Sequence, residues 1–251
     1  MLRRIGTLAK IFLTSPSRAV EASRDEKNLA PCLWIYAAFT VATMLFFMLK
    51  PGDFPDQSAA YPHEFWFKVM LWQPPLEAAW LAGLLGLAVW FRQGSLPVRL
   101  ALAVVWTAAP LGLSVYAVAG TNTDIAHWAL GLEALALVLF VPLWRQLKRS
   151  EALPVAIFML SVNIIGIVML APMVLATLLR SSNLFTATQV VGGFWILGWG
   201  TMGLRQLTGL RLPRAFMAVL LSMFFQIYVA LALNLLGLLS KTILKALVFY
   251  A

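Results

Sequence analysis

One acidic residue, Glu133, lies deep inside a long apolar stretch of the chain. It stands about ten residues from the start of that stretch, which is near the middle of a bilayer. A bare carboxylate at that depth costs several kcal/mol, so we expect the group to be neutral, hydrated in a cavity, or partnered. Asn163 lies at a similar depth in the following stretch and could hydrogen-bond to it across a helical hairpin. The pair predicts either a proton or substrate site, or a protonated carboxyl that joins two helices.

Other polar residues of the apolar stretches fit a structural role. Gln226 and Asn234 are eight residues apart and therefore share one face of a helix. We expect them to form hydrogen bonds between helices. Glu77 comes soon after Pro74 and Pro75, within a first helical turn, where a carboxylate complements the helix dipole.

The patterns of the common enzyme classes are missing from the sequence. His63 and His127 do not belong to a His-Glu-x-x-His motif, and Cys32 is the only cysteine. The chain also contains no Gly-x-Ser-x-Gly elbow and no phosphate-binding glycine-rich loop beside a lysine. We therefore predict a protein without enzyme activity, cofactor or metal.

The composition indicates the environment of the elements that must position these residues. Hydrophobic residues make up 61% of the 251 residues, and only 12% are charged, against about 25% charged in soluble domains. Long apolar stretches separated by short charged breaks predict an integral membrane protein. The net charge of +9 sits in those breaks, so membrane topology explains it before nucleic-acid binding does.

Seven apolar stretches could cross a bilayer as helices of roughly 20 residues. They are residues 29–49, 76–91, 97–119, 124–144, 153–179, 185–204 and 213–239. Five or six crossings remain possible if the short second or the glycine-rich sixth stretch does not cross fully. The sequence thus predicts an all-α transmembrane bundle, with residues 1–28 as a cytoplasmic segment and residues 29–251 as one membrane domain.

The basic residues divide unevenly between the two sides of such a bundle. With the N-terminus in the cytoplasm, the inner side holds Arg3, Arg4, Lys10, Arg18, Arg24, Lys27, Arg92, Arg99, Arg145, Lys148, Arg149, Arg205, Arg211 and Arg214. The outer side holds Lys50, Lys68, Arg180, Lys241 and Lys245. This asymmetry favours seven crossings with the N-terminus inside, in a bacterial cytoplasmic membrane.

The N-terminal residues have an amphipathic pattern. One helical face would carry Leu2, Ile5, Leu8, Ala9 and Phe12, and the other Arg3, Arg4, Thr7 and Lys10. This pattern predicts a helix that lies in the plane of the membrane interface. A frayed basic tail held only by charge is the alternative.

The longest external segment covers residues 50–73 and ends in an aromatic run over residues 65–72. Aromatic residues at this density predict an interfacial belt along the outer surface. A lid over an external cavity is the alternative.

Two short patterns concern how the helices pair and pack. Arg-Gln ends a helix and Leu-Pro starts the next at three inner loops, at residues 92–97, 145–154 and 205–213. This pattern indicates helical hairpins repeated by duplication; convergence of any inner loop on these residue types is the alternative. Small residues recur at helical spacing, which predicts close helix packing or a subunit interface. These residues are Ala79, Gly83 and Gly86 in the second stretch, and Gly193 and Gly200 in the sixth.

Residues 11–20 read Ile-Phe-Leu-Thr-Ser-Pro-Ser-Arg-Ala-Val, and residues 93–95 and 108–110 read Gln-Gly-Ser and Ala-Ala-Pro. In these motifs the first half of the chain resembles the Yip family of Ypt/Rab-interacting membrane proteins, in its bacterial form. That family usually has five spans, so seven would be a departure and the last hairpin an addition. The resemblance implies no enzyme activity and a role in organising membranes or docking partners.

Two functions follow as expectations. The first is a non-enzymatic inner-membrane protein that organises membrane or serves as an accessory subunit, with lipid and other subunits or further copies of itself as partners. The second is a small transporter, channel or lipid-handling protein that uses Glu133 together with Asn163.

Overall fold

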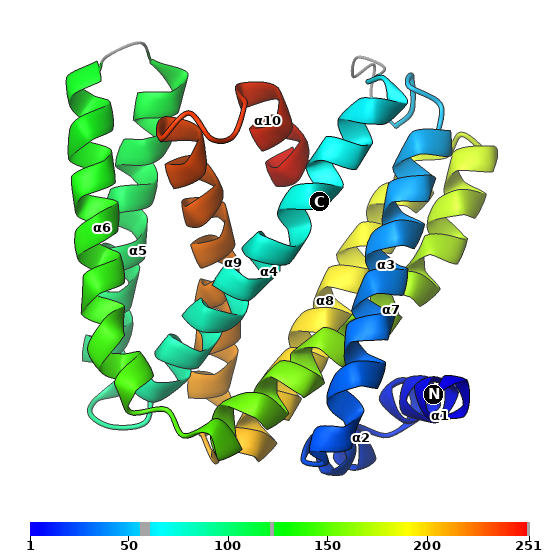
Figure 1. The fold of residues 1–251 in the computed structure, drawn as a ribbon, viewed down its shortest axis with the longest axis horizontal. Helices are drawn as coiled ribbons and strands as arrows, with labels where there is room; N and C mark the ends of the chain where they lie inside the picture. Colours follow the sequence, from blue (N-terminus) through cyan, green and yellow to red (C-terminus); the bar gives the residue numbers. More distant parts are fainter. Residues whose placement is uncertain (56–60, 121–122, 250–251) are drawn as a thin grey trace. The chain divides into compact units, whose positions relative to one another are not determined.

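A computed structural model describes residues 1–55, 61–120 and 123–249, and every regular element in these ranges is a helix (Figure 1). The helices are α1 (Leu2–Thr14), α2 (Pro16–Ser23), η1 (Glu26–Asn28), α3 (Leu29–Leu49), α4 (His63–Trp90), α5 (Leu96–Ala119), α6 (Thr123–Arg145), α7 (Arg149–Leu178), α8 (Ser182–Thr208), α9 (Leu212–Leu235) and α10 (Lys241–Phe249). The all-α prediction is confirmed for the described residues.

Five of these helical segments are long and apolar enough to cross a membrane. They are Glu26–Leu49, Leu96–Ala119, Asp124–Arg145, Arg149–Leu178 and Leu212–Leu235. They support a polytopic integral membrane protein. The second and sixth predicted spans correspond to α4 and α8, which are 28 and 27 residues long but not apolar enough to join this group. The count of seven and the orientation therefore stay predictions.

The sequence misplaces the start of the second long helix. Helix α4 begins at His63, and Pro74 and Pro75 lie inside it rather than at its first turn. The residues before the prolines keep the helix because part of that stretch is buried, notably Trp66 and Val69. The sequence predicts that the aromatic run over residues 65–72 forms an exposed belt. Only part of this run, such as Phe67, is exposed, because Trp66 and Val69 are packed inside the protein.

The Leu-Pro pattern marks helix starts at two of its three sites. Pro97 and Pro213 lie in the first turns of α5 and α9, where proline is favoured. Pro154 lies inside α7, which already begins at Arg149. The expectation that Leu153 and Pro154 open that helix is therefore wrong.

The chain forms two compact units, and each is built from two separate parts of the sequence. Unit 1 comprises residues 1–71 and 149–209, and unit 2 comprises residues 72–148 and 210–251. These units divide the chain differently from the expected boundary at residue 28, because α1 and α2 belong with α3, α7 and α8 in unit 1.

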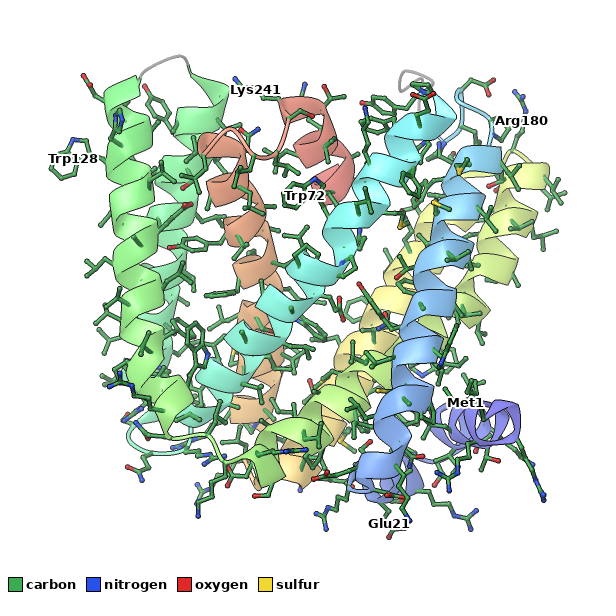
Figure 2. The ribbon with its side chains drawn as sticks, in the orientation of Figure 1. Met1, Glu21, Trp72, Trp128, Arg180 and Lys241 are labelled. Carbon is green, nitrogen blue, oxygen red and sulfur yellow. The ribbon has the colours of Figure 1, made fainter. Side chains whose placement is uncertain are left out.

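Helix α7 forms the centre of unit 1, where it packs against both α3 and α8 (Figure 1). Ion pairs mark the two ends of the unit: Arg149 meets Glu26 at 3.5 Å, and Arg180 meets Asp53 at 3.0 Å. Because these pairs join start to start and end to end, α3 and α7 run in parallel. Figure 2 shows Glu21 and Arg180 at opposite ends of this unit.

Helix α1 lies across the first turns of α3 rather than along it (Figure 1). Leu8 and Phe12 are buried, and the Phe12 ring centroid lies 5.0 Å from that of Phe158 and 6.2 Å from that of Trp199. The N-terminal residues thus form the expected helix and not a frayed tail. Part of the apolar face is covered by protein, whereas the sequence predicts that lipid covers it.

Helix α5 forms the centre of unit 2, between α6 and α9. The part of α4 that belongs to this unit packs through Gly83, where an added Cβ would lie 2.7 Å from the Phe225 ring. The Trp144 indole donates a hydrogen bond of 2.9 Å to the Ala82 carbonyl. Arg214 at the start of α9 donates to the carbonyls of Phe91, Arg92 and Gly94, which fixes it to the turn between α4 and α5.

Candidate functional site

The centre of the candidate site is Glu133 on α6, whose side chain is 2% exposed. Ser114 on α5, which is fully buried, donates a hydrogen bond of 2.5 Å from Oγ to Glu133 Oε1. Within the part of the chain that the structure describes, Glu133 Oε2 is buried and has no hydrogen-bond partner. One carboxyl oxygen therefore connects two helices, and the other is available to a further group.

Helix α9 adds Tyr228 to this site. Its side chain is buried, and its hydroxyl has no hydrogen-bond partner in the described ranges. Tyr228 lies close enough to Glu133 for an electrostatic interaction between them. Three helices of unit 2 thus each contribute one polar side chain, and we call Ser114, Glu133 and Tyr228 the buried polar cluster.

The surroundings of the buried polar cluster are mostly apolar. A cavity of about 10 Å³ lies beside Tyr228 and is lined otherwise by Trp106, Thr107, Ala136, Phe140, Phe224 and Phe225. This volume is at the lower limit for holding one water molecule. The apolar parts of α5, α6 and α9 contain no lysine or arginine to balance a charge. A neutral carboxyl that accepts a hydrogen bond from Ser114 fits these surroundings better than an anion.

Asn163, the partner expected for Glu133, forms a hydrogen bond within its own helix. Asn163 belongs to α7 in unit 1, where its Nδ2 donates a hydrogen bond of 3.1 Å to the Leu160 carbonyl. The Glu133–Asn163 pair stays a prediction, and within unit 2 the partner of Glu133 is Ser114. One feature of the sequence could have indicated Ser114. It is a hydroxyl residue within the apolar helix α5, which directly precedes α6 in a helical hairpin.

Gln226 and Asn234 have different positions on α9. Gln226 is half-buried, whereas Asn234 donates a hydrogen bond of 2.6 Å from Nδ2 to the Leu239 carbonyl. That bond closes the turn after the helix and does not join two helices. The expected interhelical role is therefore wrong for Asn234.

The packing glycines are confirmed in α4 and partly corrected in α8. Gly83 and Gly86 are buried against aromatic rings of unit 2, while Ala79 is half-buried. In α8, Gly200 is buried, but Gly193 is exposed with no atom near its Cβ position. Gly192 and Gly203 make close contacts of α8 that the sequence pattern did not reveal.

Several predicted basic residues gather at one end of unit 1. The starts of α3 and α7 and the end of α8 meet at this end, where α1 and α2 also lie. The residues are Arg3, Arg4, Lys10, Arg149 and Arg205. In unit 2, Arg92 lies in the turn after α4, Arg145 ends α6, and Lys148 follows shortly after. Each unit by itself therefore has one basic end, and the contacts of Arg214 with the turn between α4 and α5 are a structural role that the sequence did not reveal.

A metal centre finds no support in the described ranges, where no three His, Cys, Asp or Glu residues are grouped to hold an ion. Cys32 is buried in α3. The chain matches no protein-family model, no curated protein and no solved structure in comparisons with known proteins. The resemblance to the Yip family stays a prediction.

Proposed function

We propose that this chain is a non-enzymatic integral membrane protein that organises the membrane around it or serves as an accessory subunit of a membrane complex. We also place it in a bacterial cytoplasmic membrane with its N-terminus inside. The observation that carries the proposal is the attachment of α1 across the basic end of unit 1. Leu8 and Phe12 hold the helix on the protein, while Arg3, Arg4 and Lys10 remain exposed.

This arrangement gives the protein a fixed basic surface at the start of a membrane span. Residues of α1 and α2 lie beside Asn28, and the apolar part of α3 begins at Leu29. A basic surface at this level meets phospholipid headgroups, and an anionic leaflet attracts it by about 1 kcal/mol for each basic residue. The buried polar cluster supports the same function, because a hydrogen bond from Ser114 to a neutral Glu133 carboxyl joins α5 to α6 and stabilises the helical scaffold of unit 2.

Purification in mild detergent, followed by mass determination and lipid analysis, tests this function. We expect the protein to retain partner chains, further copies of itself, or phospholipid through the purification. A stable lone monomer that retains neither protein nor lipid contradicts the proposal.

A second candidate is a small transporter or channel that moves protons through the buried polar cluster. The observation that favours it is the pair of unpartnered oxygens on Glu133 and Tyr228, since buried polar groups normally have partners. Proton movement is measured in reconstituted vesicles that contain a pH-sensitive dye, for the wild-type protein and for Glu133→Gln. The control variant Gln226→Glu makes the reverse exchange, because it adds a carboxyl to α9 and keeps Glu133. If the wild-type protein moves no more protons than Glu133→Gln, this candidate is wrong.

A further inference from the structure

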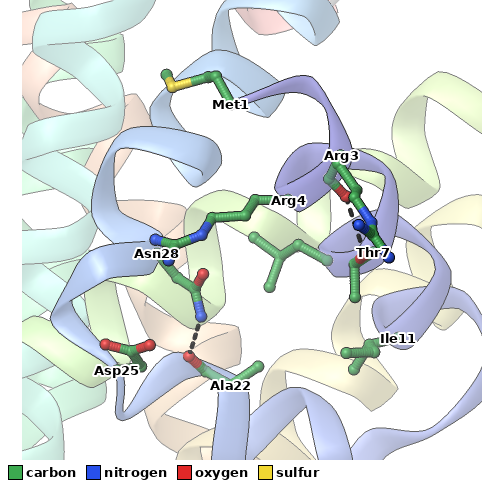
Figure 3. A pocket seen from close by; sticks show the side chains of 9 residues that line it. Met1, Arg3, Arg4, Thr7, Ile11, Ala22, Asp25 and Asn28 are labelled. Carbon is green, nitrogen blue, oxygen red and sulfur yellow. Dashed lines mark hydrogen bonds between the residues drawn. The ribbon is translucent and has the colours of Figure 1, made fainter.

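A cavity lies in unit 1 between α1 and the α2–η1 segment, at the basic end of the unit (Figure 3). Its volume is about 310 Å³, which is within the range of small-ligand pockets. Polar side chains line it from both sides: Arg3, Arg4 and Thr7 from α1, and Asp25 and Asn28 from the segment before α3.

The two arginines of this cavity are available to an anion. Within the described ranges, neither Arg3 nor Arg4 forms an ion pair with a carboxylate. Figure 3 shows the Arg4 side chain reaching over the cavity toward Asn28, with Arg3 beside Thr7 at the other side. Two guanidinium groups at one cavity suit a phosphate, because each offers a planar fork of N–H donors that matches its oxygens.

The other polar residues of the cavity keep spare hydrogen-bonding capacity. Asn28 uses one Nδ2 hydrogen for a bond of 2.8 Å to the Ala22 carbonyl, and its other hydrogen is free for a ligand. Asp25 accepts a bond of 3.0 Å from the Lys27 amide at Oδ1 and retains its second oxygen as an acceptor. The cavity therefore combines strong donors for a phosphate with one acidic acceptor.

The level of the cavity in the membrane points to the source of that phosphate. Asn28 lines the cavity and directly precedes Leu29, where the apolar part of the first span begins. Headgroups of phospholipids lie at this boundary between apolar and polar residues. Apolar side chains of Leu8 and Ile11 also line the cavity and offer contact to the glycerol backbone.

We propose that this cavity binds the headgroup of a membrane phospholipid, with the phosphate held by Arg3 and Arg4. Asp25 accepts a hydrogen bond from the group beyond the phosphate, so headgroups with donors, ethanolamine or glycerol, bind better than choline. The inference deepens the proposed membrane-organising role by naming its ligand class and site, and it rests on that role.

Lipid retention by the full-length protein in mild detergent tests the cavity. Phosphatidylethanolamine, phosphatidylglycerol and phosphatidylcholine are added separately, and bound lipid is counted by native mass spectrometry. The variant Arg3→Gln/Arg4→Gln is compared with Lys10→Gln/Arg18→Gln, which removes the same charge from α1 and α2 outside the cavity lining. We expect at least about tenfold weaker lipid binding in the first variant only, because it loses charged hydrogen bonds to phosphate.

Two additional arms keep the result open to refutation. Thr7→Phe fills the cavity from an exposed position without changing charge, and it should also displace the lipid. Glycerol phosphate and inorganic phosphate are added as competitors, and inorganic phosphate that displaces the lipid as well as glycerol phosphate does would show a free phosphate to be the true ligand and overturn the proposal. Equal lipid binding by both double variants, or no preference over choline lipid, overturns the proposal. Lipid retained equally by all variants still supports the broader membrane role, whereas a lone lipid-free monomer contradicts that role itself.

Discussion

Replacing Gly203 with alanine is expected to destabilise unit 1, although alanine favours a helix more than glycine does. A Cβ at this position of α8 would overlap the ring of Phe158 on α7. That ring is 0% exposed, and the equally buried Phe12 of α1 packs against it. The overlap therefore cannot be relieved by moving the ring into open space.

The size of the effect follows from two opposing contributions. Overfilling a well-packed core costs about 1–3 kcal/mol. The gain in helix propensity from glycine to alanine is about 1 kcal/mol. The difference predicts a loss of up to about 2 kcal/mol for Gly203→Ala. Gly198 in the same helix has no atom near its Cβ position, so Gly198→Ala should keep the gain without the cost.

Thermal unfolding in mild detergent, followed by tryptophan fluorescence, measures both variants against the wild-type protein. We expect a lower midpoint for Gly203→Ala and an unchanged or higher midpoint for Gly198→Ala. The double variant Gly203→Ala/Phe158→Leu should recover part of the loss, because the smaller side chain leaves room for the methyl group. Equal midpoints for the two single variants would refute the close packing of Gly203 on Phe158.

Four other substitutions test the remaining contacts. Ser114→Ala leaves the Glu133 carboxyl without its partner and should lower the unfolding free energy by about 1–2 kcal/mol. Glu133→Gln should cost less, because the glutamine carbonyl can still accept the hydrogen bond from Ser114. Both variants are measured by the same unfolding assay. Arg214→Lys loses the planar fork that contacts three carbonyls and should cost about 1–3 kcal/mol on that assay. Phe12→Ala should cost about 3–5 kcal/mol of the packing that holds α1, and limited proteolysis near Ser15 should become faster.

The sequence predicted well the features that depend on local patterns. The apolar stretch of α3 and its stop before Lys50 gave the observed bounds, Leu29–Leu49. The amphipathic pattern of the first residues predicted α1, and Glu133 was recognised because a carboxylate in an apolar helix is unusual. Each of these signals is contained within one helix.

Features that depend on contacts between distant segments were not predicted. Ser114 became part of the site only because α5 and α6 bring it to Glu133, and many hydroxyls in apolar helices have no such partner. Gly193 and Gly203 look alike in sequence, but only Gly203 faces a ring of α7. Local propensity favours a helix start at the prolines of α4, whereas burial of Trp66 and Val69 extends the helix before them.

The discontinuous make-up of the two units has a consequence for biosynthesis. Helix α3 is complete at Leu49, but its main partner α7 begins only at Arg149, and α8 ends at Thr208. During synthesis the ribosome therefore delivers α5 and α6 before α3 can meet α7, and α9 completes unit 2 only after unit 1 is finished. Until then α3 has α1 and the start of α4 beside it but lacks α7, so a chain that stops at residue 148 should hold neither unit in its final form and should be a target for membrane proteases.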